Sequence, residues 1–187
     1  MTPPALAVAR AERLVALFCT PDEFGSISAV TAVDVPQPHR ELLDHPSHMT
    51  VAMERFHRCP VSLEVVATRS PPATDAGYAR EILLLDQRGR RIQYGIVRID
   101  LGLVPEAVAK RILAADTPLG RVLLDASCLC DVQHVELLDI LAGPHLAALI
   151  GPGRTFGRVA TIAVGGRHAM ELLEVVAGCE VPPDGAS

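Results

Sequence analysis

Apolar residues recur three and four positions apart in the first third of the chain, a spacing typical of amphipathic helices. Residues 4–18 show it, and so do Met49 and Met53 further on. Asp44 is placed to cap that later helix, which ends near Arg58. Besides the helix after Asp44, helices are expected over residues 4–18, 39–44, 105–114 and 117–124, while residues 20–38 are expected to be a loop.

After Cys59 the pattern changes to β-like runs bounded by Gly and Pro. Strands are expected over residues 61–69, 80–86, 90–101, 129–141, 158–164 and 168–177, with a turn or flap at residues 70–77 and a Gly/Pro loop from 142 to 154. Most of these strands are joined as hairpins. The pattern therefore predicts an α+β fold with a single antiparallel sheet of about six strands and helices packed on one face.

The length of 187 residues suits one domain with a sizeable core. We expect a single domain over residues 1–187, with an N-terminal helix and loop over 1–37 and a flexible tail over 180–187. No stretch of 18 uncharged apolar residues suggests a membrane span, and the short apolar run near the N-terminus does not suit a signal peptide. The expected location is the cytoplasm, as a monomer or homodimer.

Charge and composition narrow the choice of partners. The net charge is −5 without a basic run, and only six residues are aromatic, so nucleic acid is not an expected partner. An odd number of cysteines at irregular spacing indicates a reducing compartment rather than a disulfide framework. The cysteines are Cys19, Cys59, Cys128, Cys130 and Cys179. Cys128 and Cys130 are interpreted as small buried residues, and no metal site is predicted.

Three motifs in the middle of the chain resemble those of the chorismate pyruvate-lyase family. The first is Tyr78-Ala79-Arg80-Glu81-Ile82-Leu83-Leu84, and the second is Thr117-Pro118-Leu119-Gly120-Arg121. The third is Ser47-His48-Met49-Thr50 followed by Arg55-Phe56. Their order and approximate spacing match the family over about residues 40–140. The resemblance implies a chorismate lyase-like fold.

The same resemblance implies a chemistry. Enzymes of this family remove enolpyruvate from chorismate and leave 4-hydroxybenzoate and pyruvate, without a cofactor, in the pathway to ubiquinone. Aromatisation of the ring supplies the driving force, so no cofactor is needed. The protein has to anchor the carboxylates, orient the leaving group and exclude water. The fold also serves as a small-molecule-binding domain in some transcription regulators. A non-catalytic aromatic-acid-binding module therefore stays open, as does a lyase or hydrolase for a related enolpyruvyl compound such as isochorismate.

The resemblance also suggests which residues form the site. Arg80 stands where the family binds the ring carboxylate, and an arginine fork suits a carboxylate. Met49 and Leu119 match positions that touch the same aromatic acid and would wall the ring. Arg69 is a candidate second cation for the enolpyruvyl carboxylate. By residue pattern alone, Arg80 and Arg69 are also compatible with ordinary strand or surface roles, and Met49 and Leu119 with core roles.

The family places a glutamate near the ring hydroxyl, where it could act as a general base. Glu174 is the first candidate here and Glu171 the competitor. A charge among apolar strand residues is costly to bury without a partner, so Glu174 lies either at a site or at an edge that faces water. The chain departs from the family at Ile96, where an arginine is usual. Arg98, which shares a strand face with Ile96, is a candidate compensation.

Several histidines lie near the helix after Asp44. His45 and His48 are three residues apart, a spacing that can bind metal on a helical face. Glu54 and His57 have the same spacing. Solvent-facing polar residues explain this pattern better, and no cofactor is expected.

Overall fold

The computed structural model describes residues 3–70, 77–126 and 129–178. Their centre is one antiparallel sheet of seven strands in the order β1-β5-β6-β7-β4-β3-β2. The strands are β1 (Gly25–Val30), β2 (Ser62–Arg69), β3 (Gly77–Leu85), β4 (Arg91–Asp100), β5 (Cys130–Ala142), β6 (Arg154–Val164) and β7 (Arg167–Val176). The hairpins β2–β3–β4 and β5–β6–β7 meet where β4 pairs with β7. The predicted tail, residues 71–76 of the predicted flap, Cys128 and Cys179 lie outside the described residues.

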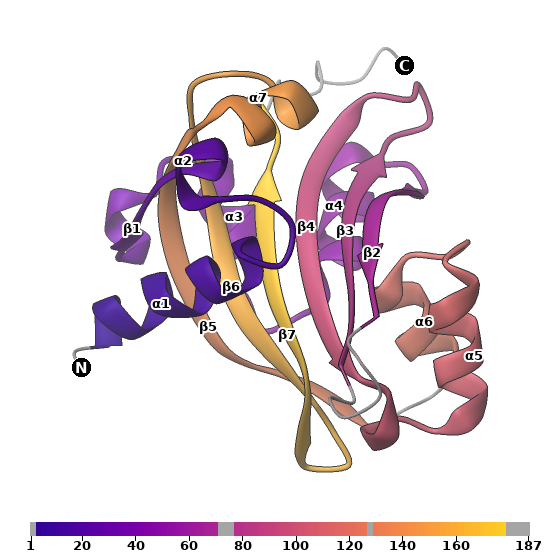
Figure 1. Ribbon diagram of the computed structural model, residues 1–187. Helices are drawn as coiled ribbons and strands as arrows, with labels where there is room; N and C mark the ends of the chain where they lie inside the picture. Colours follow the sequence, from indigo (N-terminus) through magenta and orange to yellow (C-terminus); the bar gives the residue numbers. More distant parts are fainter. Residues whose placement is uncertain (1–2, 71–76, 127–128, 179–187) are drawn as a thin grey trace.

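Helices cover both faces of this sheet (Figure 1). The α-helices are α1 (Pro3–Val15), α2 (Pro21–Phe24), α3 (His39–Leu43), α4 (Met49–His57), α5 (Glu106–Ala114), α6 (Leu119–Asp125) and α7 (Pro144–Ile150), and the 3-10 turns are η1 (Ala32–Asp34) and η2 (Leu101–Leu103). Figure 1 shows α1 in front of the sheet and α3 and α4 behind it. Within the described ranges, no helix combines the length and apolarity needed to cross a membrane.

Adjacent residues of β3 show how one sheet serves two apolar layers. Leu83 belongs to a buried cluster with Ala11 of α1. Leu84 belongs to another cluster, with Met53 of α4. Because successive strand residues point to opposite faces, the two clusters lie on opposite sides of the sheet. The sheet is thus the middle layer, with α1, α2 and α7 on one side and α3 to α6 on the other.

The α+β class and the single antiparallel sheet are confirmed, and three details differ from the prediction. The sheet has seven strands, because residues 25–30, expected to be a loop, form β1 against β5. Residues 144–150, also expected to be a loop, form α7. Helices cover two faces rather than one. The first two differences involve short elements whose weak local pattern is stabilised by packing, as when Ile27 of β1 pairs with the buried Ile140.

A buried carboxylate lies on the α1 side of the sheet. Glu81 Oε1 accepts hydrogen bonds from the Tyr94 hydroxyl at 2.6 Å and from His145 Nε2 at 2.6 Å. His145 belongs to α7, so this pair fixes α7 to β3. Burial, with smaller contributions from Glu81 and Glu23, raises the pKa of the Cys19 thiol to about 11.

Candidate functional site

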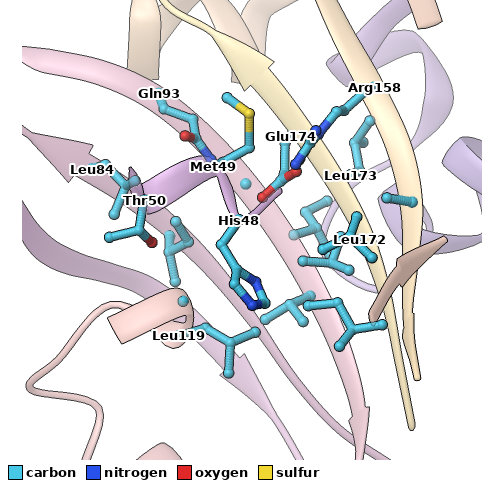
Figure 2. A pocket seen from close by; sticks show the side chains of 18 of the residues that line it. His48, Met49, Thr50, Leu84, Gln93, Leu119, Arg158, Leu172, Leu173 and Glu174 are labelled. Atoms are coloured by element: carbon cyan, nitrogen blue, oxygen red, sulfur yellow. Dashed lines mark hydrogen bonds and ion pairs between the residues drawn. The ribbon is translucent and has the colours of Figure 1, made fainter. Parts of the chain in front are cut away.

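A cavity lies between the sheet and the N-terminal ends of α4 and α6, on the side opposite α1 (Figure 2). Its floor comes mainly from side chains of β3, β4, β6 and β7. Apolar residues supply most of the walls, notably Leu63, Ile82, Leu84, Val97, Ala160, Ile162 and Leu172. The charged residues that line it are Arg80, Arg158 and Glu174. The space open to the centres of water molecules is about 50 Å³, enough for a few waters.

Arg80 projects from β3 into this cavity and is only 1% exposed. Its Nη1 donates a 3.2 Å hydrogen bond to the Ile112 carbonyl at the end of α5. Its Nε is buried without a hydrogen-bond partner, and no carboxylate of the described residues forms an ion pair with the guanidinium. Burial lowers the pKa of Arg80, and the Tyr78 side chain partly offsets that shift. An arginine stays protonated at neutral pH, so Arg80 brings to the cavity a positive charge that no carboxylate of the described residues neutralises.

Glu174 projects from β7 into the same cavity, and Arg158 of β6 lies beside it. Arg158 Nε donates to Glu174 Oε2 at 2.7 Å, an ion pair visible in Figure 2. No hydrogen bond from the part of the chain that the structure describes reaches Glu174 Oε1. Glu171 lies on the other face, within 4 Å of Arg13 and Arg98. Of the two candidate acids, Glu174 is therefore the one at the cavity.

Arg158 is a cavity residue that the sequence analysis missed. It is 1% exposed, and its guanidinium donates to three carbonyls of the α3–α4 connection. The acceptors are Leu43 at 3.3 Å, His45 at 2.8 Å and Ser47 at 3.0 Å. The available signal was a lone arginine in the apolar run Thr155 to Val164, the same signal that marked Glu174. Arg158 and Glu174 neutralise each other, which accounts for a buried charge on each of these two apolar strands.

Met49 and Leu119 both lie at the cavity, each as the first residue of a helix. The two helices approach closely because α6 continues with Gly120. A Cβ at that position would lie 2.7 Å from Thr50 Oγ1. Arg121 of α6 also forms an ion pair with Glu54 of α4. The roof of the cavity is thus one unit made of two helix ends.

Gln93 and His48 complete the polar lining. Gln93 of β4 is 3% exposed, and its Oε1 is buried without a hydrogen-bond partner. His48 precedes α4 and points into the cavity in Figure 2. Burial is the main reason that the pKa of His48 is lowered, and Arg158 adds to this while Glu174 opposes it. A neutral imidazole at this position leaves the charge balance of the cavity to Arg80, Arg158 and Glu174.

The other predicted cations are not brought to the cavity. Arg69 is exposed near the end of β2, and its Nε donates to the Leu17 carbonyl on the α1 side of the sheet. Arg98 shares a strand face with Ile96, as expected, but that face is also the α1 side. The sheet separates both Arg69 and Arg98 from Arg80. Their positions therefore do not support the predicted roles beside the ligand.

The histidines near α4 do not form a metal cluster. Within the described ranges, no group of three or more His, Cys, Asp or Glu side chains is placed to bind a metal ion. His45 contacts the Leu42 carbonyl and Ser47 instead. His134 of β5 contacts Thr161 Oγ1 at a β-bulge, which suits a structural role.

Comparisons with known proteins find similar solved structures but no sequence match. No protein-family model matches the chain, and no curated protein matches its sequence. One similar solved structure is a possible transcriptional regulator, YydK, from Bacillus subtilis, with 10% identity and a TM-score of 0.44. The match covers 71% of this chain, which spans only 64% of that protein.

Two further solved structures are similar. One is the C-terminal domain of a histidine utilization repressor from Pseudomonas syringae, with 11% identity, a TM-score of 0.47, and coverage of 68% of this chain and 99% of that one. The other is gene product SA0254 from Staphylococcus aureus, with 10% identity, a TM-score of 0.47, and coverage of 74% and 95%. All three similarities are distant.

Proposed function

We propose that this chain binds a small single-ring carboxylate in the cavity, with Arg80 as the group that holds the carboxylate. The observation that carries the proposal is the buried guanidinium of Arg80, which has an unpartnered Nε and no carboxylate partner among the described residues. Burying an unpaired charge costs several kcal/mol, so such a group is unfavourable unless something compensates it. A ligand carboxylate would supply both the charge and the hydrogen-bond acceptor.

The size of the cavity supports a ligand with one ring. Space for a few waters corresponds to roughly 100–150 Å³ at about 30 Å³ per water, which is the scale of a single benzene ring. The walls are mostly aliphatic, and the polar groups are few and specific. That combination is typical of small-molecule sites.

The charge balance favours binding of a monocarboxylate over turnover of chorismate. Chorismate carries two carboxylates, and each would need a cation. Arg158 already pairs with Glu174, so Arg80 is the one cavity arginine without an acidic partner in the described part of the chain. We therefore place a binding module for an aromatic acid first.

A cofactor-free lyase acting on chorismate is the second candidate, with isochorismate as a related substrate. Glu174 favours it, because its Oε1 is at the cavity and takes no hydrogen bond from described residues. That oxygen could accept a proton from a ring hydroxyl while Arg80 anchors the carboxylate. The enzyme would act by anchoring and orienting its substrate.

Calorimetric titration with 4-hydroxybenzoate tests the first candidate. The wild type should bind it with a stoichiometry of one. Arg80→Met should weaken binding by about thirtyfold or more, because one or two charge-assisted hydrogen bonds are lost. Arg69→Met is the matched control and should bind normally. Absence of binding to the wild type, or equal effects of both substitutions, would contradict the proposal.

Incubation with chorismate, followed by chromatography of the products, separates the two candidates. Formation of 4-hydroxybenzoate and pyruvate by the wild type, lost in Glu174→Gln, would establish the lyase. Binding of 4-hydroxybenzoate without any turnover of chorismate would leave the binding module.

A further inference from the structure

Gln93 is a buried polar group that neither folding nor carboxylate binding explains. Only 3% of it is exposed, and it lines the cavity. Its Oε1 is buried without a hydrogen-bond partner among the described residues. An unsatisfied buried amide is destabilising, so an apolar residue of similar size would suit this position better if packing were its only role.

The register of the sheet places Gln93 at the end of the cavity floor away from Arg80. Gln93 pairs with Leu84 on β3, whereas Arg80 pairs with Val97, four residues further along β4. Four strand residues correspond to about 13–14 Å along the floor. The side chains of Arg80 and Gln93 cover part of that distance, so a ring with a substituent at each end can contact both.

Glu174 lies between the two ends of the floor. It pairs with Gly95, which separates Gln93 from Val97 on the same strand face and adds no side chain to the floor. The polar groups of the cavity therefore differ along its length. The Arg80 end offers a cation and a buried Nε without a hydrogen-bond partner among the described residues, the middle offers the Glu174 carboxylate, and the far end offers the Gln93 amide.

The charge of Glu174 limits which ligand groups can lie beyond Arg80, toward Gln93. Glu174 is paired with Arg158, so a second anionic group would face Glu174 without an unpaired cation among the described cavity residues. A hydroxyl or amino group fits this end. Either can donate to Glu174 Oε1, and the Gln93 amide can accept a second donor or donate to a hydroxyl oxygen.

We infer that Gln93 determines specificity. The ligand is a ring monocarboxylate with an uncharged hydroxyl or amino group opposite its carboxylate, and the Gln93 amide binds that group. This inference rests on the proposed function, because it requires Arg80 to hold the carboxylate. It adds a residue that the family resemblance does not indicate, and it excludes dicarboxylates.

Calorimetric titration of four matched compounds tests the inference. They are benzoate, 4-hydroxybenzoate, 4-aminobenzoate and terephthalate, a dicarboxylate of the same ring. The wild type should bind the hydroxy and amino compounds at least tenfold more tightly than benzoate or terephthalate. Gln93→Leu should reduce that preference about threefold to tenfold and leave benzoate affinity unchanged, because one hydrogen bond is lost. Gln87→Leu, in the exposed β3–β4 turn, is the control.

The outcomes separate this inference from the proposed function. If none of the compounds binds the wild type, both are wrong. If benzoate binds through Arg80 but Gln93→Leu keeps the full preference for the hydroxyl group, only the role of Gln93 is wrong. Tight terephthalate binding would overturn the exclusion of dicarboxylates. A thermal melt of each variant confirms folding, and Gln93→Met provides a second variant without the amide.

Discussion

Arg80 and Arg158 form a natural pair for one experiment, because both are 1% exposed and lie on the same side of the sheet. Their partners differ. Arg158 donates to Glu174 and to three backbone carbonyls. Arg80 has a carbonyl partner, an interaction with the Tyr78 side chain, and a buried Nε without a hydrogen-bond partner among the described residues. The same substitution, to Met, should therefore strongly lower the free energy of unfolding at Arg158 but not at Arg80.

For Arg158→Met we expect a loss of about 3–5 kcal/mol, because Glu174 would be left as an uncompensated buried charge. For Arg80→Met, the lost hydrogen bond costs about 1 kcal/mol. The Ile112 carbonyl still accepts from the Ala115 amide at 3.2 Å, so it is not orphaned. Removing the unpaired charge and the orphan donor gains more than this, about 1–3 kcal/mol. Arg80→Met should thus be neutral or more stable by about 1 kcal/mol.

Urea denaturation followed by circular dichroism, without ligand, measures both changes. A gain of about 1 kcal/mol would raise the melting temperature by roughly 2–4 °C in a domain of this size. A loss above 2 kcal/mol in Arg80→Met would refute the reasoning, because Arg80 would then be an ordinary structural arginine. A stable variant that no longer binds carboxylates would show that the cation is retained for binding at a cost in stability.

Three further predictions concern the rest of the molecule. Burial lowers the pKa of four histidines near α3 and α4 below 6.5, namely His39, His45, His48 and His57. The unfolded chain therefore takes up protons before the folded protein does as the pH falls. The free energy of unfolding should therefore be constant above about pH 6.5 and decrease below it, as urea titrations at several pH values would show; a stability that rises on acidification contradicts this. Cys19, with its thiol pKa near 11, should react with iodoacetamide at pH 8 more slowly than Cys59, as measured by peptide mass spectrometry. Equal rates for the two cysteines would contradict the raised pKa of Cys19. Tyr94→Phe should lower the free energy of unfolding by about 1–3 kcal/mol, because the buried Glu81 loses a hydrogen bond, and an unchanged urea midpoint would show that this bond adds nothing.

Most of the fold could be predicted from local pattern. The long apolar strands, the helices and their order follow from periodicity and from Gly and Pro positions. The short elements β1 and α7 could not be predicted this way. Ile27 gains its stabilisation from residue 140, more than a hundred positions away, and α7 is fixed to β3 by His145 and Glu81.

Some features of the candidate site likewise follow from the sequence, and others depend on the tertiary structure. The sequence determined that Arg80 and Glu174 are charges within apolar strands, and that Glu171 and Glu174, three apart on one strand, face opposite sides. Which side holds the cavity was decided by tertiary structure, because it depends on where the N-terminal ends of α4 and α6 pack. Tertiary structure also decided that Arg158 neutralises Glu174, whereas Arg80 has no carboxylate partner and Gln93 Oε1 no hydrogen-bond donor among the described residues. These outcomes depend on strand register and helix packing between distant segments, which no local pattern encodes.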